Sequence, residues 1–296
     1  MHHLVAVDWG TSSLRAARIA ADGSVLEQRE APRGILTVPA GGFPAVLQET
    51  CGDWLRDPSA LCLVSGMAGS RQGWQEAPYC PCPAGFAELA RGLHWVERGR
   101  IAIVPGLSCD TGGVPDVMRG EEVQVFGAMD LLGLAEGTFV LPGTHSKWVR
   151  VAGGRVQSFA TFMSGEFYAL LRQHSILARM MPAQDGALDE DAFARGVRHA
   201  QASGSLLHAA FSARTLALFD RLPSAALPSY LSGLVIGEEL RLRATEARSI
   251  VLVGSPLLTQ RYALALAALG SDARTLGAEA TWRGLAAIAR ALESRP

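Results

Sequence analysis

The 296-residue sequence predicts an α/β protein built from two similar domains, because chains of this length commonly hold two. Each half begins with three short β-rich segments that include a turn of Gly, Thr and Ser. Each half then continues into helical patterns and short strands. This repeated order predicts two mixed sheets flanked by helices, with an interdomain cleft. We expect domains at 1–135 and 136–296, with a last helix at 279–293 that could pack back on the first domain.

Composition limits the kinds of partner. The formal net charge is −1, and both signs are spread along the chain, so no basic surface for nucleic acid is expected. No apolar run approaches the ~18 residues of a membrane span, and the first residues lack a signal-peptide pattern. Five cysteines occur without the spacing of a zinc site or a disulfide framework. We therefore expect a cytoplasmic protein, monomeric or homodimeric, that binds neither nucleic acid nor membrane.

Local patterns define the elements of the first half. The predicted strands are 4–8, 14–20, 25–29, 61–64 and 101–104, with an Asp22-Gly23 hairpin turn. The predicted helices are 45–55 and 121–132. Residues 66–85 lack periodicity, so we expect a long functional loop there. A second loop is expected over 105–118.

The pattern starts again near Glu136-Gly137. The predicted strands of the second half are 138–141, 147–152, 156–162, 250–253 and 273–276. Its predicted helices are 166–179, 189–202, 205–219, 229–247, 257–269 and 279–293. The first three strands repeat the opening meander of the chain.

A strand that ends in a carboxylate opens the first candidate site. Asp8 is followed by Gly10, Thr11 and Ser12, a small turn with hydroxyl groups. Backbone N–H groups of such a turn can bind an anion, and Gly10 lets a ligand approach closely. Asp8 could hold Mg²⁺ through water. The alternative is an ordinary hairpin with an exposed acid.

A second small-residue turn, Gly143-Thr144-His145, lies in the other half. Two such turns across a cleft could clamp a polyphosphate, and phosphoryl transfer needs mainly positioning and charge stabilisation. Lys147 could add a positive charge. The alternative is a solvated turn with a surface lysine and a structural histidine.

Two acids, Glu121 and Glu122, open the helix over 121–132. A general base must reach the attacking hydroxyl, and adjacent helical residues point about 100° apart, so at most one of them can serve. We favour Glu121. The alternative is that both acids cap the helix, where its dipole stabilises negative charge.

A buried strand over 250–253 runs into Gly254 and Ser255 before the next helix. Backbone at this junction could seat an adenine or a ribose. Strand–glycine–helix junctions are common in α/β proteins, so this pattern is weak by itself.

Together these motifs resemble the actin/hexokinase/Hsp70-like ATPase superfamily, whose two domains are ribonuclease H-like. More narrowly, the sequence resembles the 2-dehydro-3-deoxygalactonokinase family from residue 4 to about 290. The segments that carry this resemblance are Val7–Arg15, Ser65–Ser70, Trp74–Gly85, Met118–Gln124, Leu141–Trp148, Met163–Glu166 and Leu231–Glu239. It implies ATP, Mg²⁺ and transfer of the γ-phosphate to the 6-hydroxyl of 2-dehydro-3-deoxy-D-galactonate. The products would be 2-dehydro-3-deoxy-6-phosphogalactonate and ADP, in galactonate catabolism.

The resemblance also implies roles for matching residues. Asp8 would be the metal-linked carboxylate, and Gly10, Thr11 and Ser12 would form the first phosphate loop. Gly143, Thr144 and His145 would form the second, and Gly254 and Ser255 would lie by the adenosine. The sequence departs from the superfamily in two places: Glu121-Glu122 replaces the usual Asp, and Gly254-Ser255 replaces a Gly-Gly pair.

A sugar acid needs partners for its carboxylate. Polar candidates in the long loop are Ser70, Arg71 and Gln72, while Trp74 could pack on the sugar chain or simply anchor the loop. Ser164 and Glu166 open a later helix, whose N–H groups could meet an anion or only cap the helix.

Three other functions fit the same motifs. One is a kinase for another sugar or sugar acid, because a fold does not fix function. Another is a polyphosphate or phosphate-ester hydrolase of the superfamily. The third is a non-catalytic binding regulator, against which the glutamate pair argues.

Overall fold

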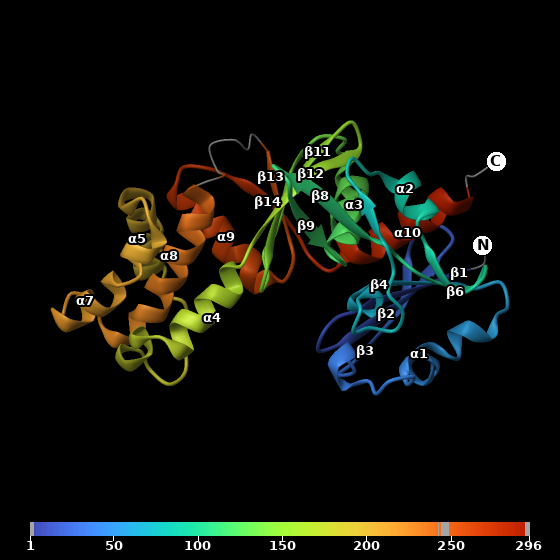
Figure 1. Ribbon diagram of the computed structural model, residues 1–296, viewed down its shortest axis with the longest axis horizontal. Coiled ribbons are helices and arrows are strands. Elements are labelled where there is room, and N and C mark those ends of the chain that lie inside the picture. The colour runs from blue at the N-terminus through green and yellow to red at the C-terminus, as the bar shows by residue number, and fades with distance from the viewer. Residues whose placement is uncertain (1–2, 242, 244–248, 294–296) are drawn as a thin grey trace. The chain divides into compact units, whose positions relative to one another are not determined.

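The computed structural model describes residues 3–241, 243 and 249–293, and the chain divides into two compact units (Figure 1). Unit 1 comprises Met1–Glu136, Val149–Ala160 and Leu276–Pro296. Unit 2 comprises Gly137–Trp148 and Thr161–Thr275. The α/β class predicted from the sequence is confirmed.

The main sheet of unit 1 has six strands in the order β3-β2-β1-β4-β7-β6. The strands are β1 (His3–Trp9), β2 (Leu14–Ala20), β3 (Val25–Ala31), β4 (Leu61–Gly66), β6 (His94–Glu97) and β7 (Ile101–Ile103). The predicted meander is confirmed, since β1 pairs antiparallel with β2, and β2 with β3. In contrast, β1 and β4 run parallel, with Asp8 opposite Ser65 and Trp9 opposite Gly66.

A second, three-stranded sheet of unit 1 corrects the expected loop over 105–118. It contains β5 (Tyr79–Pro81), β8 (Gly106–Thr111) and β9 (Val114–Met118) in the order β5-β8-β9. Gly112 and Gly113 both adopt positive φ, of 64° and 83°, and so form the tight turn between two antiparallel strands. The sequence did not predict this hairpin, because β9 contains Pro115 and mostly exposed positions, which give little β propensity.

The helices of unit 1 are α1 (Phe43–Cys51), α2 (Phe86–Arg91), α3 (Glu121–Leu132) and α10 (Glu279–Glu293). Two glycines let α3 and α10 cross in backbone contact. A Cβ atom on Gly127 would overlap the carbonyl oxygen of Ala280, and one on Gly284 would overlap that of Val123. The last helix of the chain therefore forms part of the core of unit 1.

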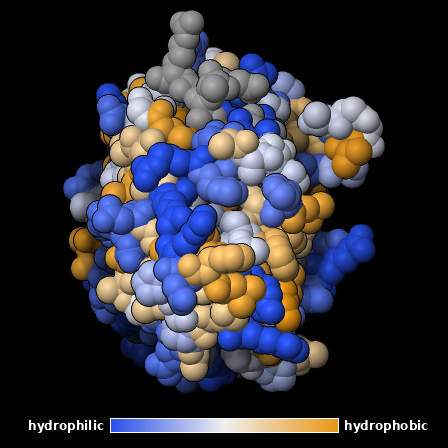
Figure 2. Space-filling view, turned by 90° about the vertical axis from the view of Figure 1, so that its left-hand side faces the viewer, coloured by the Kyte–Doolittle hydropathy of each residue, from blue (hydrophilic) through white to orange (hydrophobic). Residues whose placement is uncertain are grey.

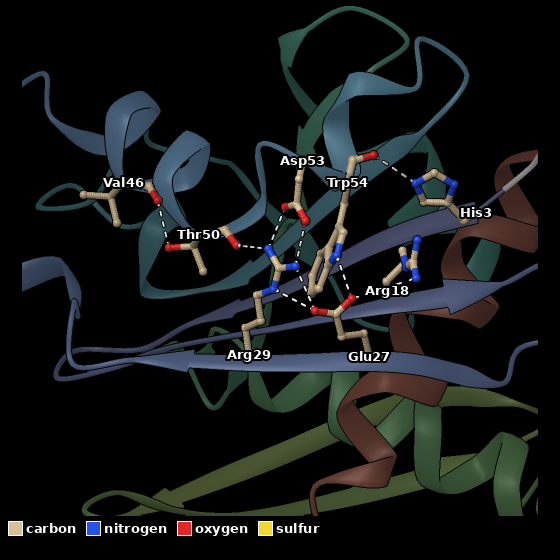
Figure 3. A network of polar contacts seen from close by, with 8 residues as sticks. All are labelled: His3, Arg18, Glu27, Arg29, Val46, Thr50, Asp53 and Trp54. Atoms are coloured by element: carbon tan, nitrogen blue, oxygen red, sulfur yellow. Dashed lines mark hydrogen bonds and ion pairs between the residues drawn. The ribbon is translucent and has the colours of Figure 1, made fainter.

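One edge of the six-stranded sheet is tied to the α1 segment by Arg29 in β3 (Figure 3). Its guanidinium donates to Thr50 O at 2.8 Å, to both oxygens of Asp53 at 2.6 and 2.7 Å, and to Glu27. The same group lies 4.1 Å from the centre of the Trp54 ring. Hydrogen bonds from Arg29 lower the pKa of Asp53 to about 2. Because these groups are partly exposed, the network mainly fixes geometry.

The sheet that opens the second half has the order β12-β11-β10-β13-β14. Its strands are β10 (Gly137–Leu141), β11 (Ser146–Ala152), β12 (Arg155–Phe162), β13 (Ile250–Val253) and β14 (Ala273–Leu276), close to the predicted ranges. β10 and β13 run parallel, with Val140 opposite Leu252.

The helices of unit 2 are α4 (Ser164–His174), α5 (Glu190–Ser203), α6 (Leu206–Ala209), α7 (Ser212–Leu218), α8 (Leu227–Arg241) and α9 (Pro256–Ala268). The predicted helix 205–219 is two helices, and the predicted helix 166–179 ends at His174 and is followed by a short 3-10 turn. Of the helix predicted at 229–247, residues 242 and 244–247 lie outside the described residues. Glycines again allow close packing, because side chains on Gly196 or Gly233 would strike the backbone of the facing helix in the α5–α8 pair.

Short 3-10 helices complete the elements: η1 (Ile35–Thr37), η2 (Trp54–Arg56), η3 (Met67–Gly69), η4 (Ile176–Met180) and η5 (Ser224–Ala226). Around the helices of unit 2, large apolar side chains are exposed at Leu207, Phe211, Leu218 and Phe219. Figure 2, which views the α5–α7 end, shows apolar side chains in separate groups among hydrophilic ones. In the described part of the chain, every helix is too short or too polar to span a lipid bilayer.

The α3–α10 crossing gives a stability prediction. Gly127→Ala should lower the free energy of unfolding by about 2 kcal/mol or more, because the new methyl group meets backbone that can only move apart. Urea unfolding measures this change. Gly186→Ala is the matched control, since a Cβ atom there meets nothing within 4 Å. Equal stability of the two variants would contradict the close approach of the helices.

Candidate functional site

Asp8 lies near the end of β1 and forms an ion pair with Arg15 across the β1–β2 hairpin. Gly10 N–H donates to Ser13 O at 2.9 Å, which closes the turn, and Thr11 and Ser12 are exposed at its tip. The next loop supports the turn from behind, because a side chain on Gly34 would overlap the backbone of Thr11 and Ser12. The predicted turn is therefore exposed to solvent and held in place by the loop that packs against it.

Three distant segments of unit 1 meet beside Asp8. Gly66, at the end of β4, has φ +87°, and a Cβ atom there would lie 2.8 Å from Trp9 O and 3.3 Å from Asp8 Oδ1. Gly120, the N-cap residue of α3, has φ +103°, and its Cβ atom would lie 3.1 Å from Gly66 Cα. Glycine is required at both positions, because the backbone is left-handed and the neighbours are close. The carboxylate of Asp8 and the start of α3 thus share one small region.

The two acids at the start of α3 differ in exposure. The carboxylate of Glu121 accepts the Arg119 N–H at 2.9 Å, and that of Glu122 accepts the Gly120 N–H at 2.7 Å. Glu122 therefore binds the N-cap residue of α3, as the capping alternative expects, while Glu121 binds the backbone just before the helix. Glu122 is fully buried, whereas Glu121 is partly exposed. Only Glu121 is open to a substrate as the structure stands.

Arg119 fixes the long loop that follows β4. Its guanidinium is buried, donates to Ala77 O at 2.7 Å and lies 4.4 Å from the centre of the Tyr79 ring. Its Nε and Nη1 atoms are buried without a hydrogen-bond partner among the described residues. Sequence reasoning missed Arg119 as a site residue, although only Gly120 separates it from the glutamate pair.

The residues predicted to bind the sugar acid lie along this loop. Arg71 and Gln72 are exposed, and Arg71 pairs with Glu76 at 3.0 Å. The Ser70 hydroxyl is buried and has no hydrogen-bond partner among the described residues. The ring of Trp74 stacks on Phe43 with centroids 6.4 Å apart and packs against the core of unit 1. Trp74 thus anchors the loop and stays a predicted contact of the sugar chain, beside the polar candidates Ser70, Arg71 and Gln72.

In unit 2 the β10–β11 turn is held against the start of α4. Glu166 N–H donates to Thr144 O at 3.0 Å, and the Glu166 carboxylate lies 2.5 Å from His145 Nε2. A side chain on Gly165 would overlap the carbonyl of Gly143. Ser164 and Glu166, predicted to bind substrate, are therefore grouped with Gly143, Thr144 and His145.

Lys147 is not the surface lysine considered as an alternative. Its side chain is buried, and Nζ donates to Thr161 Oγ1 at 2.8 Å. Strand alternation places Lys147 on the opposite face of β11 from Ser146 and Trp148.

Gly254 and Ser255 follow the end of β13, beside the same turn. Gly254 has φ +154°, and a Cβ atom there would lie 3.7 Å from Pro142 O. Ser255 is the N-cap residue of α9. A small hollow lies next to Gly143. Its lining includes Tyr168, Ser232, Val235, Ile236, Leu258 and Arg261.

Sequence reasoning also missed Glu239 as a site residue. It lies in α8, is 2 % exposed, and accepts hydrogen bonds from side chains beside the turn. Burial raises the pKa of Glu239, and these hydrogen bonds act in the opposite direction. The available signal was an acid inside the apolar run Leu231–Leu240.

The residues around Asp8 fit Mg²⁺ bound mainly by phosphate and water. Among the described residues no group of three or more His, Cys, Asp or Glu could hold a metal ion. Mg²⁺ in nucleotide sites commonly uses one or two carboxylates, with waters and phosphate oxygens as its other ligands. One carboxylate beside a turn with backbone N–H and hydroxyl groups is compatible with such a site.

The fold is that of the actin/hexokinase-like ATPases. Two solved structures share it at low identity. One is the activator of 2-hydroxyisocaproyl-CoA dehydratase from Clostridium difficile with bound ADPNP (TM-score 0.52, 12% identity, 98% of this chain and 94% of that chain). The other is component A of (R)-2-hydroxyglutaryl-CoA dehydratase from Acidaminococcus fermentans (TM-score 0.53, 13% identity, 99% and 98%).

The chain belongs to the 2-keto-3-deoxy-galactonokinase family, whose sequence model matches residues 8–288. It is 38% identical to a Rhizobium meliloti (strain 1021) protein named "Probable 2-dehydro-3-deoxygalactonokinase DgoK1", over 98% of this chain and 97% of that one. It is 34% identical to the 2-dehydro-3-deoxygalactonokinase of Escherichia coli (strain K12), over 97% and 98%. A crystal structure of a Sinorhizobium meliloti protein named a "putative 2-dehydro-3-deoxygalactonokinase protein" aligns with a TM-score of 0.87 at 38% identity, covering 99% of this chain and 100% of that one. The family predicted from the sequence is confirmed.

Burial of Glu122 gives a pH prediction. Burial, and then the charge of Glu121, raise the pKa of Glu122 from 4.5 to about 8. The folded protein therefore keeps a proton that the unfolded chain releases, so stability should fall as pH rises from 4.5 towards 8. Between pH 5.5 and 7.5 the wild type should lose at least about 1 kcal/mol more unfolding free energy than Glu122→Gln. Urea unfolding at both pH values measures this, and parallel pH profiles would contradict it.

Proposed function

We propose that the protein transfers the γ-phosphate of ATP to the 6-hydroxyl of 2-dehydro-3-deoxy-D-galactonate, in galactonate catabolism. Membership of the 2-keto-3-deoxy-galactonokinase family over residues 8–288 supports this reaction. The observation that carries the chemistry is the meeting of Asp8, Gly66 and the start of α3 at the ends of two parallel strands. Ligands of open α/β sheets bind at such carboxyl ends.

Glu121 is the proposed general base. It is the more exposed of the two acids, and it lies at the helix start beside Asp8 and Gly66. In this role its carboxylate accepts the proton of the 6-hydroxyl as that oxygen attacks the γ-phosphate. Ser70, Arg71 and Gln72 are the proposed contacts of the sugar acid, and Ser164 and Glu166 remain predicted contacts.

The small-residue turns are the proposed phosphate contacts. Gly10, Thr11 and Ser12 offer N–H and hydroxyl donors in unit 1, and Gly143, Thr144 and His145 do so in unit 2, with Lys147 nearby. Gly254, Ser255 and the hollow beside Gly143 would receive the nucleoside, because the hollow combines apolar walls with Ser232 and Arg261. Mg²⁺ bound at Asp8 would neutralise charge on the β- and γ-phosphates. A cytoplasmic location and a monomeric or homodimeric state remain predictions from the sequence.

The base assignment is tested with two neighbouring variants. Glu121→Gln should lower kcat by about 10²–10⁴-fold, because a positioned base contributes that much, while ATP still binds. Glu122→Gln should change kcat much less, since its carboxyl is buried. ADP release with 2-dehydro-3-deoxygalactonate as acceptor measures both. The reverse order of effects would move the role to Glu122.

Asp8→Asn should abolish most of the Mg²⁺-dependent turnover, because the amide loses the negative charge that attracts the ion. The measurement is ADP release over a range of Mg²⁺ concentrations. An unchanged rate at every concentration would remove Asp8 from the site.

The alternatives are separated in the same assay. ADP formation that follows a different sugar acid in a substrate panel would point to another kinase. Phosphate release without any acceptor would point to a hydrolase. Formation of the 6-phosphate in proportion to ADP would support the proposed reaction.

A further inference from the structure

One buried carboxylate links four elements of unit 2. Oε1 of Glu239 in α8 accepts from Ser146 Oγ at 2.8 Å and from Trp148 Nε1 at 2.6 Å, both in β11. Oε2 accepts from Tyr262 OH at 2.8 Å in α9 and from Ser164 Oγ at the start of α4. All four donors are neutral side chains. A buried carboxyl group is tolerated only when it is hydrogen-bonded, so these four side chains and this acid hold each other in place.

Two of these links end at the β10–β11 turn. Ser146 directly follows Gly143-Thr144-His145, and Ser164 begins the helix whose Glu166 N–H donates to Thr144 O at 3.0 Å. One oxygen of Glu239 therefore fixes the strand that leaves the turn. The other oxygen fixes the helix start that contacts the turn.

We propose that Glu239 is a positioning residue that, through Ser146 and Ser164, holds the Gly143–His145 turn in the shape that binds the phosphates of ATP. This inference rests on the proposed function, in which that turn contacts ATP. Glu239 itself is 2 % exposed, so it acts through the two serines rather than on the nucleotide.

Single-serine variants test the proposal. Ser146→Ala should raise KM for ATP about tenfold, as expected for losing one hydrogen bond to a charged group, and Ser164→Ala should do likewise. KM for the sugar acid should stay unchanged in Ser146→Ala, because Ser146 is not among the predicted contacts of that substrate. The matched control is Ser212→Ala, which also removes one serine hydroxyl bonded inside unit 2, to Tyr230 OH at 2.7 Å. It should lower Tm to a similar degree without changing KM for ATP.

Substitution of the acid separates hydrogen bonding from charge. In Glu239→Gln the amide oxygen can accept from Ser146 and Trp148, and the amide NH₂ can donate to the hydroxyls of Ser164 and Tyr262. This variant should keep KM for ATP within about threefold of wild type, whereas Glu239→Ala should raise it about tenfold or more. If Glu239→Ala does not fold, the serine variants carry the test.

Three outcomes would overturn the proposal. The first is an unchanged KM for ATP in both serine variants. The second is a Glu239→Gln enzyme as impaired as Glu239→Ala, which would require the charge itself. The third is a rise in KM for the sugar acid alone in Ser146→Ala. Failure of the proposed function is distinguishable, because the wild type itself would then form no ADP with 2-dehydro-3-deoxygalactonate.

Discussion

The close crossing of α3 and α10 is the constraint on which unit 1 depends. Gly127 and Gly284 let the two backbones touch, and Asp130 of α3 pairs with Arg283 and Arg290 of α10. With the axis of α3 fixed in this way, its first turn comes to lie against Gly66 and close to Asp8. The place of the glutamate pair is therefore a consequence of helix packing, and the helix that provides it comes from the other end of the chain.

The two units share one arrangement at the ends of their parallel strands. β1 and β4 run parallel in unit 1, and β10 and β13 run parallel in the second sheet. At each pair of carboxyl ends the backbone turns at glycines, Gly10 and Gly66 in one case and Gly143 and Gly254 in the other. Where side chains are absent, backbone N–H groups are exposed, which is the chemistry that the proposed phosphate contacts require. Buried polar groups lie nearby, Arg119 in unit 1 and Glu239 in unit 2.

The sequence was sufficient for the strands of both meanders, for α3 and for the family. Periodicity and turn residues are local signals, and these elements follow them closely. The hairpin of β8 and β9 could not be predicted, because its exposed positions and Pro115 give little β propensity and its partner β5 lies far away in the chain. The same limit applies within the site: burial distinguishes Glu122 from Glu121, and Trp74 from its exposed neighbours. Burial arises from tertiary packing, so the sequence alone cannot show which of two similar neighbouring residues is buried.

Unit 1 is built from three separate segments of the chain, and this has a consequence for its synthesis. A ribosome releases residues 1–136 first, and it releases α10 only after the whole of unit 2 has emerged. Until then the face of α3 around Gly127 lacks α10, its packing partner in the folded protein. Unit 1 can therefore reach its final fold only after the whole of unit 2 has been synthesised.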